Sequence, residues 1–170
     1  RLLDAVKAFD EAARLSPGNL EAYLELGEAR LLRGDAELAL SAFDAALEVY
    51  ADDATAHRGR GSALRALGRH DEAIAAFEKA LSIDPAHGPS LLSLGRSLLE
   101  KGRLEEAIAA FERAVSARPE DAETREALGF AYMSVGRYEE AAGALRMAIK
   151  NGSQAGHVHY WLGACYHHLG

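Results

Sequence analysis

The fold is decided by a pattern that occurs at 68–85 as GRHDEAIAAFEKALSIDP and again at 102–119 as GRLEEAIAAFERAVSARP. Both stretches begin with Gly-Arg, carry a phenylalanine in the same column and end with proline. Outward from them, the same residue types recur with a fixed 34-residue period, and no insertion or deletion breaks the register. A fixed period of this length indicates a repeat architecture.

Glycine and large apolar residues form columns through the whole chain. The first glycine column contains Gly27, Gly61, Gly95, Gly129 and Gly163, and the second contains Gly34, Gly68, Gly102, Gly136 and Gly170. The large apolar column contains Phe9, Phe43, Phe77, Phe111 and Leu145. Columns that persist over the whole chain predict that every repeat has the same internal packing.

The sequence of each repeat predicts two helices joined by a glycine turn. One face of the first helix is formed in the third full repeat by Leu91, Leu94 and Leu98, which have helical spacing. The second helix of that repeat presents Ala107, Phe111 and Ala114 in the same way. Gly102 lies between the two helices, and glycine readily adopts the left-handed conformation that ends a helix.

Two further signals concern packing and helix ends. A glycine in the middle of a helix costs about 1 kcal/mol relative to alanine, so we expect the paired helix to cross closely at each glycine of the first column. Proline stands just past the expected second helices at Pro17, Pro85 and Pro119, where it blocks continuation. Ala51 and Ser153 replace it at the other two joints.

Over its whole length the sequence resembles the tetratricopeptide repeat family, because the two quoted stretches are very close to the family pattern. The resemblance implies an all-α fold, a right-handed α-solenoid of antiparallel helix pairs that forms a single array over 1–170. In this register 1–19 is the second helix of a partial repeat, and 156–170 is the first helix of a further one. The full repeats are 20–53, 54–87, 88–121 and 122–155.

Composition excludes some classes of function. The formal net charge of −7 argues against a nucleic-acid binder, which needs a basic surface to displace counterions. No apolar run approaches the roughly 20 residues that span a bilayer, so direct membrane insertion is not expected. The chain opens at Arg1 with no signal-peptide pattern, and a targeting segment outside it stays an open alternative. We favour the cytoplasm and leave the periplasm open.

No catalytic or metal-binding constellation appears in the sequence. We find no phosphate-binding loop, dinucleotide fingerprint or nucleophile elbow, and we therefore expect no enzyme activity and no cofactor. Histidines and the single cysteine gather at 157–168, but only Cys165 and His168 have the spacing of two ligands on one helical face. Cys165 falls in a column of small residues, which favours a buried core position over a metal ligand.

The resemblance also implies that the first helices line a concave groove, whose face lies opposite the packing face. In the first two full repeats this face carries Glu21, Leu24, Glu25, Glu28, Arg58, Ser62 and Arg65. In the third and fourth it carries Leu92, Arg96, Leu99, Glu126, Phe130 and Met133, and the last helix adds Tyr160 and Trp161 next to His157. The groove is thus acidic at its beginning, arginine-bearing in the middle and aromatic at its end.

This groove predicts a protein or peptide ligand that combines an acidic stretch with hydrophobic residues, because arginine suits carboxylates and aromatic rings seat apolar side chains. The alternative is a mixed, solvated surface with no dedicated ligand. We expect an adaptor that scaffolds a protein assembly. The alternative in another class is the recognition arm of a larger enzyme or of a secretion or assembly component.

Two features depart from the regular pattern. The half-repeats at either end predict exposed apolar faces, with Val6 and Phe9 at one end and Leu162 and Tyr166 at the other, through which the chain would self-associate. His57, Arg60 and Arg125 fall on packing faces where other repeats carry apolar residues. Their stems can pack while their polar ends reach water or a carboxylate, and the alternative is a locally loosened repeat.

Overall fold

The computed structural model describes all residues from 1 to 170 and contains ten α-helices and no strand. The chain forms two compact parts, an N-terminal segment (residues 1–85) and a C-terminal segment (residues 86–170). The N-terminal segment contains α1 (Leu2–Leu15), α2 (Leu20–Arg33), α3 (Ala36–Val49), α4 (Ala54–Ala66) and α5 (His70–Ile83). The C-terminal segment contains α6 (Gly88–Glu100), α7 (Leu104–Ala117), α8 (Ala122–Ser134), α9 (Tyr138–Lys150) and α10 (Gly156–Leu169).

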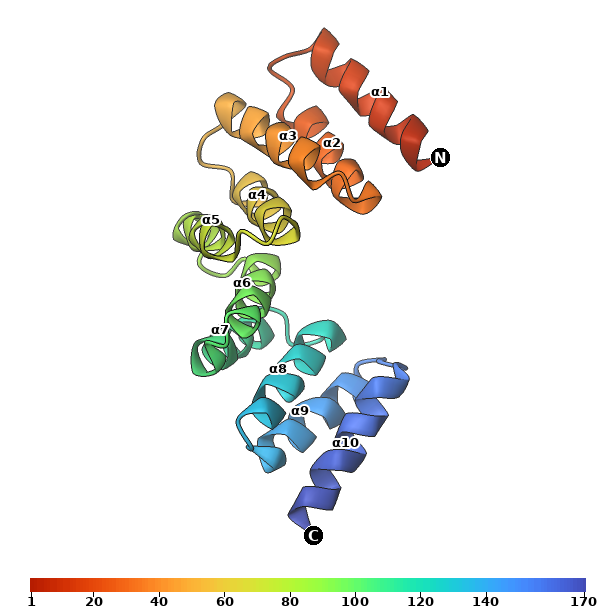
Figure 1. Cartoon of the computed structure of the whole chain (residues 1–170), viewed down its shortest axis with the longest axis vertical. Helices are drawn as coiled ribbons and strands as arrows, with labels where there is room; N and C mark the ends of the chain where they lie inside the picture. Colours follow the sequence, from red (N-terminus) through yellow and green to blue (C-terminus); the bar gives the residue numbers. More distant parts are fainter. The chain divides into compact units, whose positions relative to one another are not determined.

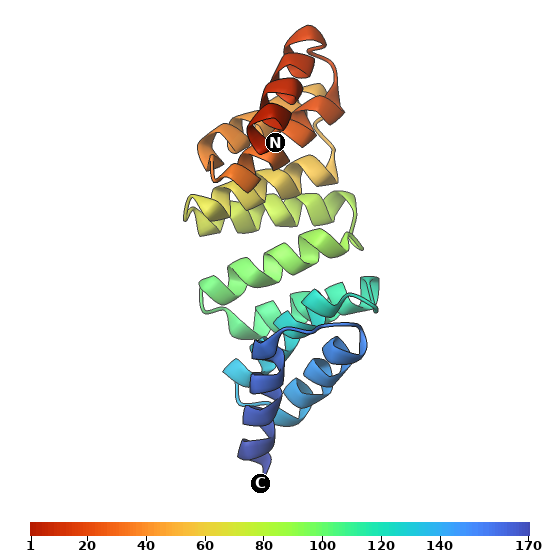
Figure 2. The same cartoon turned by 90° about the vertical axis from the view of Figure 1, so that its right-hand side faces the viewer.

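Within each segment, consecutive helices pack side by side as hairpins (Figures 1 and 2). Each of the ranges 20–53, 54–87, 88–121 and 122–155 contains two helices, while α1 and α10 occupy the flanking ranges. The expected all-α fold of antiparallel helix pairs is confirmed. That one continuous array runs from 1 to 170 stays a prediction, although the 34-residue register itself continues past residue 85 without a break.

The helix ends follow the sequence signals. Gly102 ends α6 with a φ of +73°, in the left-handed region expected of it, and the other glycines of that column have positive φ values too. Asn19 and Asp53 begin α2 and α4, where their side chains accept hydrogen bonds from the amides of Ala22 (3.1 Å) and Ala56 (2.6 Å). Every predicted proline stop lies just beyond a second helix, as at α7, which ends at Ala117 before Pro119.

The core of each repeat is a large side chain of the second helix seated on a glycine of the first. Phe43, Phe77, Phe111 and Leu145 are all completely buried. A Cβ atom added to Gly61 would lie 2.6 Å from the Phe77 ring, and one added to Gly129 would lie 2.7 Å from Leu145. The expected close crossing is therefore confirmed at Gly27, Gly61, Gly95 and Gly129.

The two ends of the chain differ from expectation. Val6 is buried in a cluster with Leu26, Ala29 and Ala42, and Phe9 packs against that cluster. The prediction that Val6 and Phe9 form an exposed face is therefore wrong, because α1 turns this face towards α2 and α3. At the other end Tyr166 is exposed and Leu162 is half-buried, and a Cβ atom at Gly163 would meet nothing within 4 Å.

Polar residues on the packing faces direct their charged ends outwards. Arg60 donates from Nε to Asp44 Oδ1 at 2.8 Å, with both side chains partly exposed. Arg125 donates to the carbonyl oxygen of Pro119 from both Nε and Nη2, and the His57 ring contacts the Ala51 carbonyl at 2.9 Å. Arg60 thus reaches a carboxylate, as the interpretation expected, whereas Arg125 and His57 reach backbone carbonyl groups instead.

Candidate functional site

The candidate site is a cleft in the C-terminal segment, where α8 lies between α6 and α10. All three are first helices of their repeats, so the cleft lies on the face that the sequence predicts as a groove. Its volume is about 340 Å³. It is lined by Arg96, Leu99, Glu123, Glu126, Ala127, Phe130, His157 and Trp161.

The central wall of the cleft is one stripe of α8. Glu123, Glu126 and Phe130 are spaced i, i+3, i+7, which places them on a single helical face. Thr124 and Leu128, on the opposite face, are buried in the core, so packing fixes the direction of the stripe. Asp121 begins the helix and accepts a hydrogen bond from the Thr124 hydroxyl group. The acidic residues therefore stand near the start of α8, and the aromatic ring stands one turn further along.

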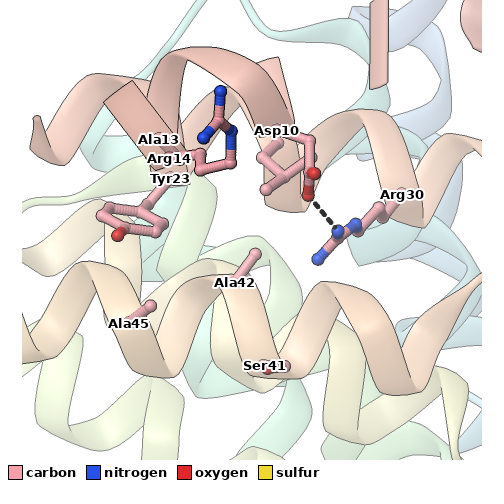
Figure 3. Close-up of a pocket in the computed structure, with 9 residues that line it drawn as sticks. Asp10, Ala13, Arg14, Tyr23, Arg30, Ser41, Ala42 and Ala45 are labelled. Carbon is pink, nitrogen blue, oxygen red and sulfur yellow. Dashed lines mark hydrogen bonds and ion pairs between the residues drawn. The ribbon is translucent and has the colours of Figure 1, made fainter. Parts of the chain in front are cut away.

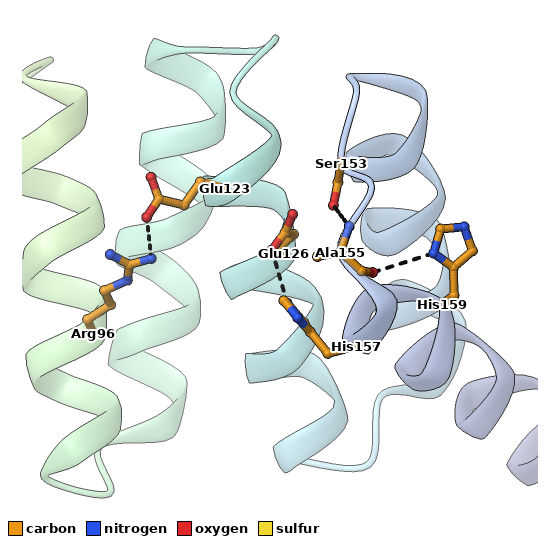
Figure 4. A network of polar contacts seen from close by, with 7 residues as sticks. All are labelled: Arg96, Glu123, Glu126, Ser153, Ala155, His157 and His159. Atoms are coloured by element: carbon orange, nitrogen blue, oxygen red, sulfur yellow. Dashed lines mark hydrogen bonds and ion pairs between the residues drawn. The ribbon is translucent and has the colours of Figure 1, made fainter.

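Two polar contacts cross the cleft, one in each direction from α8 (Figure 4). Arg96 of α6 donates from Nη2 to Glu123 Oε1 at 2.7 Å. On the other side, His157 Nε2 of α10 lies 3.2 Å from Glu126 Oε2. One side-chain contact thus joins α6 to α8, and the other joins α8 to α10.

The aromatic part of the cleft joins α8 to α10. The ring centroids of Phe130 and Trp161 are 5.1 Å apart at an interplanar angle of 42°. The His157 ring meets Trp161 edge-on, with centroids 4.5 Å apart. Phe130 is 40% exposed, and such an aromatic surface beside polar groups is typical of a site that seats an apolar side chain.

In the N-terminal segment the predicted groove face carries a related ion pair. Arg58 of α4 donates from Nη2 to Glu28 Oε1 of α2 at 2.5 Å, and the Arg58 side chain is only 21% exposed. Glu21 and Glu25 are exposed on α2, and Leu24 packs against the core cluster of Phe43. The remaining two predicted residues, Ser62 and Arg65, are half-buried on α4.

Six residues predicted on the groove face come together in the cleft, namely Arg96, Leu99, Glu126, Phe130, His157 and Trp161. Leu92 is buried, Met133 is half-buried and Tyr160 is exposed, and none of the three is among the residues that line the cleft. The sequence reasoning did not select Glu123 or Ala127. Their helical spacing from Phe130, two turns and one turn before it, is the signal that would have found them.

A second pocket lies between α1, α2 and α3 (Figure 3). It has a volume of about 240 Å³ and is lined by all three helices, with Tyr23 of α2 at one side and the small residues Ser41, Ala42 and Ala45 of α3 at another. Arg30 donates from Nη2 to Asp10 Oδ1 at 2.8 Å within it. We assign the pocket no function, because each of its two arginines is paired with a carboxylate of α1, Arg30 with Asp10 and Arg14 with Glu11.

The cysteine that the sequence places near several histidines belongs to the core. Cys165 is completely buried, which confirms its interpretation as a small core residue, and burial raises the pKa of its thiol. No three histidine, cysteine, aspartate or glutamate side chains are grouped so that they could hold a metal ion. None of the ten helices is both long and apolar enough to cross a membrane.

Comparison with known proteins places these features in a family. Models of the tetratricopeptide repeat match residues 1–48 and 33–88, and residues 64–123 and 98–165. The matched ranges overlap one another and together include every residue that lines the cleft. A search of curated protein sequences found no match.

Solved structures with the same fold include the following three proteins. A thermophilic tetratricopeptide repeat protein of Thermus thermophilus superposes with a TM-score of 0.82 at 21% identity, over 98% of this chain and 91% of that one. PilF of Pseudomonas aeruginosa gives a TM-score of 0.82 at 24% identity, over 94% and 70%. YrrB, described as a tetratricopeptide repeat protein with an unusual peptide-binding site, gives 0.76 at 25% identity, over 97% and 85%.

Proposed function

Because the chain belongs to the tetratricopeptide repeat family, we propose that it is a scaffold whose first helices hold a segment of a protein partner. Members of this family generally act as protein-interaction scaffolds, and their fold is typically not enzymatic. The observation that carries the proposal is the cleft between α6, α8 and α10, with its partly exposed aromatic surface. The peptide-binding site described for YrrB supports the same class of ligand.

The cleft supports a hydrophobic anchor for the partner. Phe130 and Trp161 form one apolar wall and Leu99 contributes from α6. Aromatic residues are enriched among the few interface residues that contribute most of the binding energy once a partner covers them. A leucine or aromatic side chain of the partner would bury against these rings while backbone groups reach the polar contacts on either side.

That the groove arginines bind an acidic ligand stays a prediction. Two ion pairs of these arginines weaken it. Arg58 is paired with Glu28, and Arg96 is paired with Glu123. An incoming carboxylate would first have to displace one of these glutamates, so the arginines favour an acidic ligand less than the sequence alone suggests. The recognition arm of a larger assembly also stays a prediction, which the full-length reading frame tests.

A selection from a random display library of short peptides on the immobilised chain tests the proposed function. Peptides that bind the wild type should bind the double variant Phe130→Ala with Trp161→Ala at least about tenfold more weakly, as expected for the loss of hot-spot side chains. Tyr50→Ala, which removes an exposed ring just after α3, is the matched control and should bind like the wild type. Equal binding by the double variant would refute the cleft as the binding site.

A further inference from the structure

The charges in the cleft do not balance. Glu123 and Glu126 face only one permanently charged cation, Arg96, which is engaged with Glu123 at 2.7 Å. Glu126 lies 3.2 Å from the His157 imidazole, a group without a permanent charge. The cleft therefore offers a carboxylate that has no permanently charged partner, and only 20% of that side chain is exposed.

Aromatic faces stand next to this carboxylate. Phe130 follows Glu126 by one turn of α8, and Trp161 follows His157 by one turn of α10. The faces of aromatic rings attract cations, and tryptophan does so most strongly. Ala127, the small residue between the carboxylate and the ring, keeps the space in front of them open. A carboxylate beside two rings recognises a cation that has an alkyl stem.

We propose that the cleft takes a lysine or arginine side chain of the partner segment, with its charged end on Glu126 and its stem on Phe130 and Trp161. This inference rests on the proposed function, because it names the chemistry of the segment that the groove holds. The incoming cation replaces His157 as the partner of Glu126, and the His157 side chain, which is 52% exposed, has room to turn towards water.

The same geometry disfavours an acidic residue at this place. A carboxylate entering the cleft would meet Glu126 at close range and would find Arg96 already paired with Glu123. Like charges at short distance repel most strongly where solvent is partly excluded. The cleft is therefore selective for a basic side chain next to hydrophobic ones, whereas the groove arginines alone would have favoured an acidic ligand.

The composition of the peptides enriched in the display selection tests this inference first. We expect lysine or arginine flanked by hydrophobic residues. An enriched peptide is then synthesised together with an analogue in which glutamine replaces the basic residue. Binding of both to the full chain is followed by the fluorescence of Trp161, the only tryptophan, and by calorimetry for every variant.

Glu126→Gln removes the charge and keeps the shape of the side chain. It should weaken binding of the basic peptide about tenfold, because a hydrogen bond between charged groups is roughly twice as strong as a neutral one. It should leave the glutamine analogue nearly unchanged. Glu139→Gln, on an exposed acid of α9, is the matched control and should change neither affinity.

The outcomes separate this inference from the proposed function. Enrichment of acidic peptides, or basic peptides that bind Glu126→Gln as tightly as the wild type, would overturn the inference. If those peptides still depend on Phe130 and Trp161, the proposed function stands. If no enriched peptide depends on the two rings, both fall.

Discussion

The helices α8 and α10 are the first helices of successive repeats. The glycine in the middle of α8 is covered by a side chain of the next helix, whereas the glycine in the middle of α10 is not. Gly129 of α8 meets the Leu145 side chain of α9, so that an added Cβ atom would lie 2.7 Å from it. Gly163 occupies the same column in α10, and an added Cβ atom would meet nothing. The glycine has a packing reason only where a second helix crosses it.

The tyrosines one turn further along show the same difference. Tyr132 of α8 is buried and donates its hydroxyl to Glu112 Oε1 of α7 at 2.6 Å, while Arg137 lies 4.5 Å above its ring. Tyr166, which occupies the same column in α10, is 48% exposed. Arg137 stands at the start of α9, the helix that follows α8, whereas α10 is contacted by the preceding helices α8 and α9 alone.

Removing the covering side chain should have the largest effect. Phe111→Ala empties the space over Gly95, and we expect the free energy of unfolding to fall by about 3–5 kcal/mol, as for other buried phenylalanines. Urea unfolding followed by circular dichroism measures the change. Tyr50→Ala, at an exposed ring, should stay within about 0.5 kcal/mol of the wild type. A loss below about 1 kcal/mol at Phe111 would contradict the packing described for the column.

Filling a covered glycine should have the next largest effect. In Gly61→Ala the new methyl group would lie 2.6 Å from the buried Phe77 ring, which has no room to withdraw. We expect destabilisation by about 1–3 kcal/mol from overpacking, reduced by the better helix propensity of alanine. The midpoint of urea unfolding reports it. A variant more stable than the wild type would show that the column does not need glycine at this position.

Much of this packing could be predicted from the sequence, because the fixed repeat period determines which residues face each other. The glycine turn at Gly102 and the buried ring of Phe111 follow from spacing within one repeat, whereas the groove face that carries Phe130 was implied by the family resemblance. The ion pairs between repeats do not follow from this spacing. Arg96 and Glu123 belong to successive repeats, and whether they meet depends on the distance between helices and on the length of two flexible side chains.

The ends of the array were equally hard to predict, for a related reason. Spacing identifies the apolar face of α1 through Val6 and Phe9 but does not tell whether that face turns inwards or outwards. Only the packing of α1 against α2 decides it. The apolar side chains that α1 does expose, Leu2, Leu3 and Leu15, lie outside the repeat columns.

Filling the bare glycine should have a smaller and opposite effect. Gly163→Ala adds a methyl group where nothing lies within 4 Å, so only helix propensity changes. We expect stabilisation of α10 by about 0.5–1 kcal/mol, seen as slower hydrogen exchange of its amides. Gly143→Ala is the matched control, because Gly143 lies inside α9 and its added Cβ atom would also meet nothing. Destabilisation at Gly163 alone would mean that another chain covers this face in solution.

Tyr132 and Tyr166 should differ in how they change the free energy of unfolding at alkaline pH. Burial, and then the hydrogen bond to Glu112, raises the pKa of Tyr132 to about 12 from its ordinary value of 10.0. A pKa raised by folding contributes stability that is complete below pH 10 and is lost as the pH rises towards 12, because the unfolded chain releases its proton first. Tyr132→Phe should therefore show a shallower fall in the free energy of unfolding over this range than the wild type. Tyr166→Phe, at the exposed position, should fall as steeply as the wild type, and equal slopes for all three proteins would contradict the burial of Tyr132.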